Sequence, residues 1–418
     1  MAISESNHDS GDGYTLRMLS TMDDLSLVER VLSDAFGTEG LVDPDPETSP
    51  VEPKRAIVVE FDGEPVSTLG AQTRDLVVPG AILPATHLIQ GGVRQTHRRH
   101  GLMTRMMVHQ LRTAHAEHGE SIAVLWASEA RIYQRYGFGL CFQNHSFAVD
   151  TRELRVNGVP DDARLREGNP VALASELRAI FDEVMPTRPG WSSRGDRHWG
   201  WPLNDLPPEL RMGASGKRAL LHDGPDGPDG YAIWSRKQEW TGSLASGEAI
   251  VHEVVATNPA AYVALWRFLL TVDLTRTVRS VFAAQDEPLW QVVNEPLRLG
   301  VTARDGMWLR LLDLPDALTR REYATPIDIV LEIEDEMFPD NAGRWRLTAA
   351  NGAAKCVSTT DEPQLSMDVS VVSSAYLGGV SLASHAAVGR IAEHRPGALA
   401  EASTAFGWPI APSALDIF

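Results

Sequence analysis

The stretch VRQTHRRHGLMTRMM, residues 93–107, carries the pattern that decides the fold. An apolar strand ends at Val93, a turn rich in arginine and histidine follows, and an amphipathic helix starts near Gly101. The free N–H groups at a helix start point outward, and the helix dipole favours an anion there. Arg98 and Arg99 add charge-assisted hydrogen bonds to phosphate oxygens. The segment therefore predicts a phosphate site.

Neither of two common phosphate motifs occurs in this segment. A P-loop needs GxxxxGK[ST], and a dinucleotide fold needs GxGxxG. A basic surface turn in front of an ordinary helix remains an alternative explanation for these residues.

Helix and strand patterns alternate around this turn over the first 150 residues, which predicts a mixed α/β unit. We expect a long helix after Gly101 and a short helix around Tyr133. The expected strands are 55–60, 65–70, 76–78, 88–93, 121–127 and 141–149.

Two further units are expected after a polar linker at 151–170. A strand at 250–256, a helix at 260–270 and a strand at 277–284 repeat the order found around the phosphate turn, which indicates a degenerate duplication. The second turn, 256–259, has no cation and no glycine, so the second copy should not bind the cofactor. Beyond residue 312 we expect a small α+β unit. Its predicted antiparallel strands are 327–335, 344–350, 353–359 and 365–372, and its predicted helical segments are 373–379 and 384–404.

Composition limits the possible functions. The chain has 418 residues, 43% hydrophobic and 22% charged, with a formal net charge of −18. That charge argues against nucleic-acid binding and suits a cationic small molecule or a basic peptide, although an acidic surface also simply maintains solubility. The two cysteines, Cys141 and Cys356, form no CxxC or Cys/His cluster, so we expect a reducing compartment, no disulfides and no metal. The start of the chain lacks the pattern of a secretory signal, and no apolar run is long enough to span a membrane. A cytoplasmic protein is expected.

Two motifs resemble those of GNAT acetyltransferases. The turn RRHGLM, residues 98–103, is similar to their Q/R-x-x-G-x-G/A sequence, with Met103 in place of the usual small residue. The segments Ala127-Ser128-Glu129 and IYQRYGFG (132–139) resemble the Eis-like (enhanced intracellular survival) branch. The resemblance implies three domains: a catalytic GNAT domain (1–150), a degenerate GNAT-like domain (151–311) and a sterol-carrier-protein-like domain (312–418). The fold class is therefore α/β (α+β).

The resemblance also implies a cofactor, acetyl-CoA, and roles for particular residues. Gly91, Gly92 and Val93 should pair with the pantetheine arm, and the Val93 amide should polarise the thioester. Tyr133 should protonate the departing thiolate. Ser128 and Glu129 should contact the far side of the cofactor. The residues expected to hold the pyrophosphate are Arg98, Arg99, His100, Gly101, Leu102, Met103 and Thr104.

In Eis-like enzymes a C-terminal carboxylate on an aromatic residue serves as the base, which implies this role for Phe418. Glu129 is the fallback base, and Phe418 as a purely structural end of the fold is the alternative. Asp34, Phe36 and Trp126 are candidate acceptor contacts. The implied function is N-acetylation of a small cationic acceptor, such as an aminoglycoside or a polyamine, and the resemblance implies a homo-oligomer, a hexamer. A protein-lysine acetyltransferase and a non-catalytic lipid or drug carrier are the alternatives.

Overall fold

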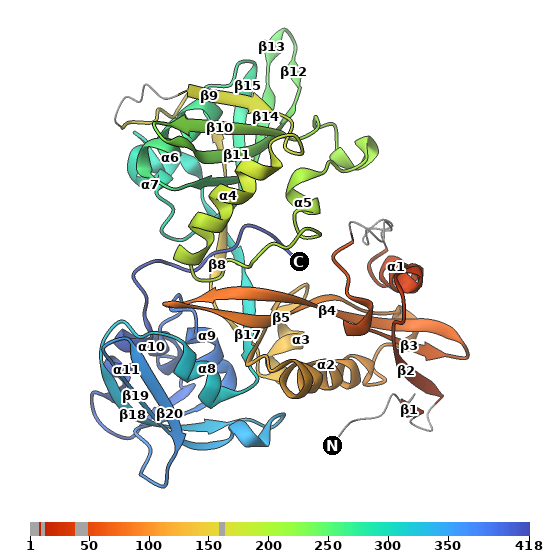
Figure 1. Cartoon of the computed structure of the whole chain (residues 1–418), viewed down its shortest axis with the longest axis vertical. Coiled ribbons are helices and arrows are strands. Elements are labelled where there is room, and N and C mark those ends of the chain that lie inside the picture. Colours follow the sequence, from red (N-terminus) through yellow and green to blue (C-terminus); the bar gives the residue numbers. More distant parts are fainter. Residues whose placement is uncertain (1–7, 10–12, 38–48, 159–163) are drawn as a thin grey trace.

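In the residues that the structure describes, three large β-sheets, each with its own helices, and one two-stranded ribbon form the fold (Figure 1). The computed structural model describes residues 8–9, 13–37, 49–158 and 164–418. In Figure 1 the second unit lies at the top, the first at the lower right and the C-terminal unit at the lower left, so the three meet in the middle.

The first sheet has eight strands in the order β1-β2-β3-β4-β5-β6-β17-β7. Helices α1 and α2 cover opposite faces, because α1 packs in the cluster of Val58 and α2 in the cluster of the adjacent Val59. Its elements are β1 (His8–Asp9), β2 (Tyr14–Met18), α1 (Leu25–Phe36), β3 (Ala56–Phe61), β4 (Glu64–Val78), β5 (Ala81–Val93), α2 (Leu102–His118), β6 (Ile122–Trp126), α3 (Ala130–Tyr133), β7 (Gly139–Leu140) and β17 (Met307–Leu311). The separate strands predicted at 65–70 and 76–78 are wrong: both belong to the single strand β4, whose residues are nearly all buried.

The second sheet has seven strands in the order β16-β8-β15-β14-β11-β10-β9. The strand–helix–strand unit β14–α6–β15 is parallel, as is β5–α2–β6 in the first sheet. The elements are β8 (Gln143–Asp150), β9 (Arg164–Gly168), α4 (Ala174–Val184), α5 (Gly200–Leu203), β10 (Arg218–Gly224), β11 (Gly227–Lys237), β14 (Gly247–Ala256), α6 (Pro259–Leu269), β15 (Thr275–Ala283), α7 (Leu289–Val292) and β16 (Thr302–Asp305). A small ribbon, β12 (Trp240–Thr241) with β13 (Leu244–Ala245), extends from this unit.

The first two sheets exchange strands across the expected boundaries at 150 and 311. Strand β8 ends at Asp150 but pairs with β15 in the second sheet, and β17 ends at Leu311 but lies between β6 and β7 in the first. Part of the predicted linker at 151–170 is strand β9, which completes the edge of the second sheet beside β10. The two units are therefore joined by shared strands.

The C-terminal unit has a five-stranded sheet in the order β20-β19-β18-β21-β22. Its elements are α8 (Leu314–Arg320), β18 (Ile327–Glu334), β19 (Gly343–Ala350), β20 (Ala353–Ser358), β21 (Leu365–Asp368), α9 (Val369–Ala375), α10 (Leu382–Ala386), β22 (Ile391–Glu393) and α11 (Ala398–Phe406). The antiparallel strand predicted at 365–372 is wrong, because β21 runs parallel to β18 and ends at Asp368, which caps α9 by accepting from Ser370 N. The helical segment predicted at 384–404 is interrupted by β22.

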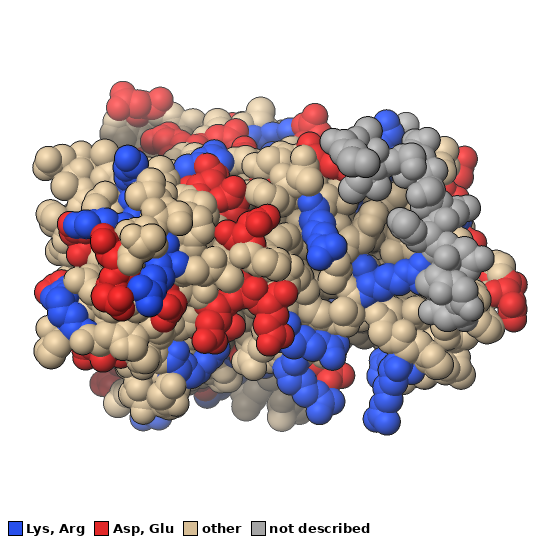
Figure 2. Space-filling view, turned by 90° about the horizontal axis from the view of Figure 1, so that it is seen from below, with Lys and Arg blue, Asp and Glu red and all other residues tan. Residues whose placement is uncertain are grey.

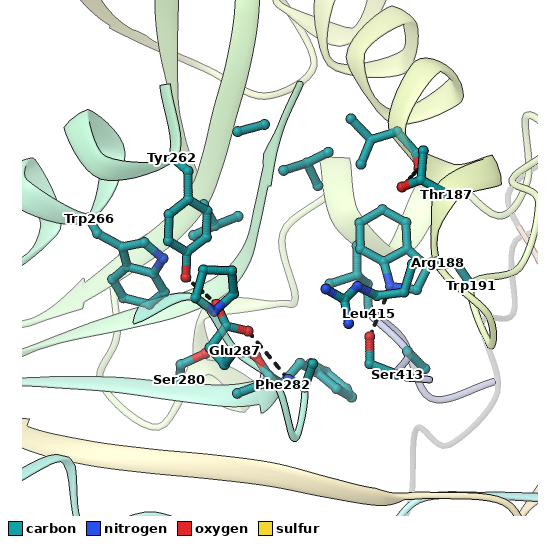
Figure 3. A pocket seen from close by; sticks show the side chains of 18 residues that line it. Thr187, Arg188, Trp191, Tyr262, Trp266, Ser280, Phe282, Glu287, Ser413 and Leu415 are labelled. Atoms are coloured by element: carbon teal, nitrogen blue, oxygen red, sulfur yellow. Dashed lines mark hydrogen bonds between the residues drawn. The ribbon is translucent and has the colours of Figure 1, made fainter. Parts of the chain in front are cut away.

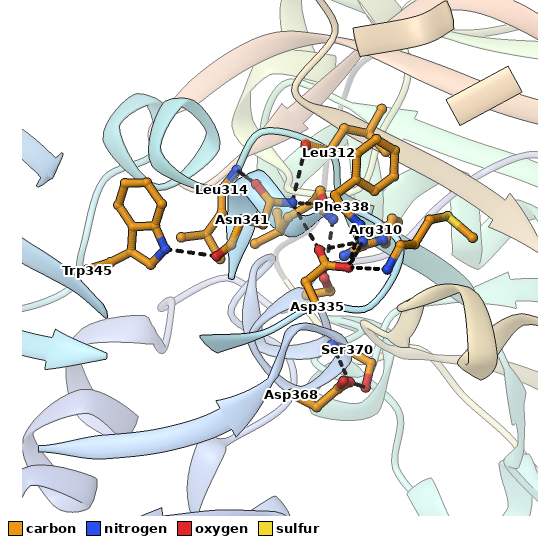
Figure 4. A network of polar contacts seen from close by, with 12 residues as sticks. Arg310, Leu312, Leu314, Asp335, Phe338, Asn341, Trp345, Asp368 and Ser370 are labelled. Carbon is orange, nitrogen blue, oxygen red and sulfur yellow. Dashed lines mark hydrogen bonds and ion pairs between the residues drawn. The ribbon is translucent and has the colours of Figure 1, made fainter. Parts of the chain in front are cut away.

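A buried polar network joins the C-terminal unit to the first sheet (Figure 4). Arg310, on β17, has no exposed surface, and its Nη2 donates to both carboxylate oxygens of Asp335 at 2.7 and 2.6 Å. Asn341 adds a further donor to the same carboxylate at 3.1 Å. Gly137 makes room for this arginine, because a Cβ there would lie 2.7 Å from the guanidinium. The IYQRYGFG segment is thus packed against the anchor between two units.

The last eight residues, 411–418, run between the second unit and the first sheet (Figure 1), and we call them the C-terminal strap. Ser413 donates its N–H to Pro189 O at 3.0 Å and accepts from Trp191 Nε1 at 3.1 Å. Asp416 pairs with Arg74 of β4 at 3.0 Å. The strap therefore leads from the second unit to the middle of the first sheet.

Candidate active site

An open strand edge lies at the centre of the first sheet. Strand β5 pairs with β6 only as far as Leu88 and Leu125, whereas its ladder with β4 continues to Val93. Arg94 N–H bonds to Val66 O on the β4 side at 2.9 Å. Backbone groups alternate in direction along an antiparallel ladder, so the Val93 N–H points to the open side. An extended arm that contains amides can pair with this edge as an added strand.

A β-bulge shapes the same edge. The β4–β5 register shifts between Thr68 and Gly70, and Gln90 has a positive φ of 54°. The two glycines after it are close to helices on opposite faces: a Cβ on Gly91 would lie 3.6 Å from Met103 Cε, and one on Gly92 would lie 3.0 Å from Leu32 Cδ2. Gly92 therefore allows α1 to approach the strand end closely, whereas a Cβ on Gly91 would make only an ordinary contact with α2. The sequence shows these glycines, but nothing in it marks Gln90 as the bulge.

The turn before α2 leaves its backbone donors free. Gly101 is the N-cap, with φ 76°, and no side chain caps the helix. Arg105 N donates to Gly101 O at 3.0 Å. Within the described ranges the N–H groups of Leu102, Met103 and Thr104 have no acceptor, which makes them available to an anion.

Two arginines and a histidine lie in the turn beside these donors. Arg98, Arg99 and His100 are exposed, and Arg98 Nε donates to Val93 O at 3.4 Å. Among the residues that the structure describes, neither Arg98 nor Arg99 has a carboxylate partner. In Figure 2 the first unit forms the right-hand part of the lower face and shows several Lys and Arg side chains, while a group of Asp and Glu lies beside it toward the C-terminal unit. The net negative charge is thus unevenly distributed.

The corresponding turn in the second unit is already satisfied by protein groups. Asn258 caps α6 by accepting from Ala261 N at 3.0 Å, and its amide donates to Asp229 at 2.7 Å. Thr257 N donates to the backbone oxygen of Asp229 at 2.9 Å. A carboxylate therefore lies where a phosphate would need positive charge.

Tyr133 lies at the end of α3 and is 8% exposed. It packs in the hydrophobic cluster that contains Leu88. Met103, which follows the turn before α2, packs against this cluster. Burial raises the pKa of Tyr133 above its ordinary value of 10.0; a hydrogen bond with Ser128 lowers it, and nearby Tyr136 and Glu129 raise it. The phenol therefore stays protonated at neutral pH and can donate a proton.

Ser128 and Glu129 follow β6 and are exposed. Glu129 Oε2 accepts from Arg131 Nη2 at 3.0 Å, so this carboxylate is engaged by its neighbour. Tyr136 bonds to Thr104 Oγ1 at 2.9 Å and so connects the α3 segment to the phosphate turn.

Phe418 lies on the face of β5 opposite to Tyr133. Its ring is 4.5 Å from the His87 ring and packs against the cluster that contains Ile89. Leu88, the residue between them in sequence, packs in the Tyr133 cluster. Because consecutive strand residues face opposite sides, Tyr133 and Phe418 flank the same stretch of β5 from its two faces.

Sequence reasoning missed the residues that hold Phe418. His87 is fully buried, and its Nε2 lies 2.8 Å from Ser192 Oγ. Burial, and then the positive charge of Arg74, hold the pKa of His87 well below 6.5, so the ring is neutral. Arg74 lies with its guanidinium 5.8 Å from the Phe418 ring centre. The signal in the sequence that could have revealed these residues is a histidine and an arginine within strands whose other residues are mostly buried.

The candidate acceptor residues fall into two places. Asp34 pairs with Arg94, and Phe36 is 49% exposed at the end of α1, 3.8 Å from where a Gly92 Cβ would lie. Trp126 instead packs edge-on against Phe142 and Phe282, the latter on β15 of the second unit. Asp34 and Phe36 therefore lie together at the strand end, apart from the surroundings of Trp126.

The described part of the chain has no group of three or more potential metal ligands. No helix within it is long and apolar enough to cross a membrane.

This fold and site define a GNAT acetyltransferase, a class that transfers acetyl groups from acetyl-CoA. Two acetyltransferase (GNAT) domain families match residues 18–141 and 190–311, and a sterol carrier protein domain family matches residues 314–414. The ranges follow the three units in order, although 190–311 omits β8 and β9 of the second sheet and includes β17, which lies in the first.

Named relatives narrow the class. An uncharacterized N-acetyltransferase of Streptomyces avermitilis is 39% identical over 358 residues, 84% of this chain and 87% of that protein. N-acetyltransferase Eis of Mycobacterium tuberculosis is 33% identical over 329 residues, 76% of each chain. The crystal structure of Eis1 from Mycobacterium abscessus superimposes with a TM-score of 0.82 at 28% identity, covering 96% of this chain and all of that one. The chain belongs to the Eis-like GNAT N-acetyltransferases.

Proposed function

We propose that this N-acetyltransferase moves the acetyl group of acetyl-CoA to an amine of a small cationic acceptor, such as an aminoglycoside or a polyamine. The observation that carries the proposal is the open edge of β5 between Tyr133 on one face and Phe418 on the other. Acyl transfer to an amine needs a base on the side of the incoming amine and an acid on the side of the leaving thiol, and this arrangement supplies both sides.

On the cofactor side, the uncapped start of α2 binds the pyrophosphate. The free N–H groups of residues 102–104 and the side chains of Arg98 and Arg99 all carry partial or full positive charge. Gly91, Gly92 and Val93 run beside the pantetheine arm, and Ser128 and Glu129 border its far side.

During transfer, the Val93 N–H stabilises negative charge that develops on the acetyl oxygen. Tyr133 gives its proton to the departing sulfur. Its raised pKa suits this role, because the group must remain protonated until the thiolate forms.

On the acceptor side, a carboxylate at Phe418 takes the proton of the attacking amine, and Glu129 is the second candidate. An α-carboxyl has an ordinary pKa of roughly 3.3–3.7 and is a weak base in water. Its position is fixed by the Phe418 ring, which packs against His87 and the cluster that contains Ile89. Asp34, half exposed beside Phe36, attracts the cationic acceptor.

Two alternative functions would give different results in an acetyl-transfer assay. A protein-lysine acetyltransferase would acetylate a lysine peptide faster than a small polyamine. A lipid or drug carrier would show no transfer, although the free donors of the α2 turn and the buried Tyr133 phenol argue for a working site.

A thiol-release assay with acetyl-CoA and a panel of amines tests the proposal. The panel contains aminoglycosides, polyamines and lysine peptides, with a Tyr133→Phe variant as the inactive control. Release that is fastest with a small polycation and lost in the variant supports the proposal. Release only with lysine peptides, or none with any amine, would contradict it. Sedimentation of the same protein tests the expected hexamer.

A further inference from the structure

A cavity of about 220 Å³ lies in the second unit beneath the C-terminal strap (Figure 3). Strands β14 and β15 pair only as far as Val251 and Ser280 and then diverge, as β5 and β6 do in the first sheet. Helix α6 lines one side of the opening and strap residues 413–415 line another. The duplication has thus preserved an opening between two parallel strands, although the phosphate turn beside it is blocked by Asn258 and Asp229.

A carboxyl group without a cationic partner lines this cavity. Glu287 accepts hydrogen bonds from the Tyr262 hydroxyl and from Ala284 N at 3.3 Å, and both donors are neutral. Arg188 also lines the cavity, and its guanidinium is bound to Asp286 Oδ1 at 2.7 Å. Over the described ranges Glu287 takes part in no ion pair. Burial raises the pKa of Glu287, and the hydrogen bonds from Tyr262 and Ala284, followed by the charge of Arg188, offset it only in part.

Aromatic side chains form the rest of the recognition surface. The rings of Tyr262 and Trp266 come from α6, Phe282 from β15, and Trp191 from the loop that binds the strap. In Figure 3 these rings surround the space next to Glu287. Aromatic faces attract cations most strongly when water is excluded.

We propose that this cavity binds a small organic cation, with its ammonium group against Glu287 and its apolar part against the indole and phenyl rings. A cation there supplies the charge that the carboxylate lacks. The cavity is smaller than the roughly 300–1,000 Å³ of drug-sized sites, so the ligand is a compact amine. The site is separate from the acceptor region at Asp34 and Phe36, which lies on α1 of the first unit.

Equilibrium dialysis of the full chain with benzyltrimethylammonium tests the proposal. This probe has no N–H and cannot be acetylated, so its binding is read without turnover. We expect one probe per chain in the presence of saturating acetyl-CoA. Glu287→Gln keeps the shape and the Tyr262 contact but removes the charge, and it should weaken binding at least tenfold. Asp196→Asn, which alters an exposed carboxylate of the same unit, should leave binding unchanged.

A cavity-filling variant provides the second arm. Ala256→Phe, at the end of β14, fills the space and leaves Glu287 intact, so it should also prevent binding. Thermal unfolding and acetyl transfer by each variant show that the chain remains folded. Absence of probe binding to the unmodified chain overturns the proposal. Equal binding by Glu287→Gln, or binding lost in Asp34→Asn instead, overturns it as well, because the probe then occupies another site.

Discussion

Arg74 of β4 and Asp416 of the C-terminal strap form a buried ion pair, with Nη2 and Oδ2 3.0 Å apart. The Arg74 side chain is only 1% exposed, and its Nε also donates to Ser193 O at 2.8 Å. One arginine therefore ties the first sheet to a loop of the second unit and to the strap, two residues before Phe418.

Asp416→Asn should detach the strap and slow turnover. Loss of the carboxylate leaves the Arg74 charge buried without compensation, which costs about 3–5 kcal/mol. The strap can leave while the sheets remain folded, so we expect a lower kcat with an unchanged dissociation constant for acetyl-CoA. Steady-state kinetics measure kcat, and calorimetry measures the dissociation constant for acetyl-CoA. Glu401→Gln, in an exposed pair with Arg395, is the control. Normal turnover by Asp416→Asn would show that the strap needs no such anchor.

The same pair defines a pH dependence. Burial alone would raise the pKa of Asp416, but Arg74 and Arg194 outweigh it, so its pKa lies below the ordinary 3.8. A carboxyl group with a lowered pKa stabilises the fold above its unfolded pKa and loses that effect as the pH falls through its folded pKa. The anchor should therefore persist to pH values below the ordinary range of an aspartate.

Replacing both Arg98 and Arg99 by alanine should weaken acetyl-CoA binding by roughly 2–4 kcal/mol, the effect of two lost charge-assisted contacts. Arg112, exposed on the same helix but nearly three turns away, provides the control as Arg112→Ala. Calorimetry should also give one acetyl-CoA site per chain, because in the second unit Asn258 already caps α6, the helix equivalent to α2. An unchanged dissociation constant in the double variant would remove the phosphate turn from the site.

Tyr133→Phe should lower kcat by about 10²–10⁴-fold, the usual contribution of a positioned acid, while acetyl-CoA affinity holds. Tyr136→Phe is the matched control, because it removes a phenol from the same segment. The Tyr136 phenol bonds to Thr104. Because the pKa of Tyr133 is raised, the acid should remain protonated beyond pH 10, and turnover should show no alkaline loss below that value. Equal effects of the two variants would make Tyr133 a packing residue.

The sequence predicted those features of the fold that depend on residues close together in the chain. The strand that ends at Val93, the helix that starts near Gly101 and the strand–helix–strand repeat all depend on neighbouring residues, and the structure contains them. The helix and strand patterns likewise predicted three units. The position of β17 could not be predicted, because its apolar run fits any sheet interior.

Contacts between distant residues were beyond local reasoning. Arg55 and Glu120 are 65 residues apart and form a buried pair at 2.8 Å, and no pattern near either residue marks it. The same holds for Arg74 with Asp416, and for the Gln90 bulge, whose positive φ is imposed by the β4–β5 register. The residues that surround Phe418 could therefore be identified only in the structure.

Asp335→Asn should lower the stability of the junction between the first sheet and the C-terminal unit. Arg310 has no exposed surface and its Nε and Nη1 already lack partners within the described ranges, so loss of Asp335 costs about 3–5 kcal/mol. Thermal unfolding should show an earlier transition. Asp328→Asn, in an exposed pair with Arg346 on the same sheet, should change it little. Identical midpoints for the two variants would contradict a role for the buried network.

Extension of the chain beyond Phe418 is the most direct test of the proposed base. Two added glycines replace the carboxylate at Phe418 by an amide, which cannot accept the proton of the incoming amine. A positioned base contributes about 10²–10⁴-fold, so kcat should fall by that order. Acetyl-CoA affinity should hold, because the phosphate turn lies on the opposite side of the strand opening from the Phe418 ring.

Phe418→Leu separates the carboxylate from the ring. It keeps the charge and removes the aromatic contact with His87, which lies 4.5 Å away, so a smaller loss is expected. The extended protein should also lose the acid limb of its pH–rate profile, because the group that titrates there is gone. If extension leaves both kcat and that limb unchanged, the carboxylate of Phe418 takes no proton. Glu129→Gln then becomes the decisive variant, because Glu129 is the remaining candidate base beside Tyr133.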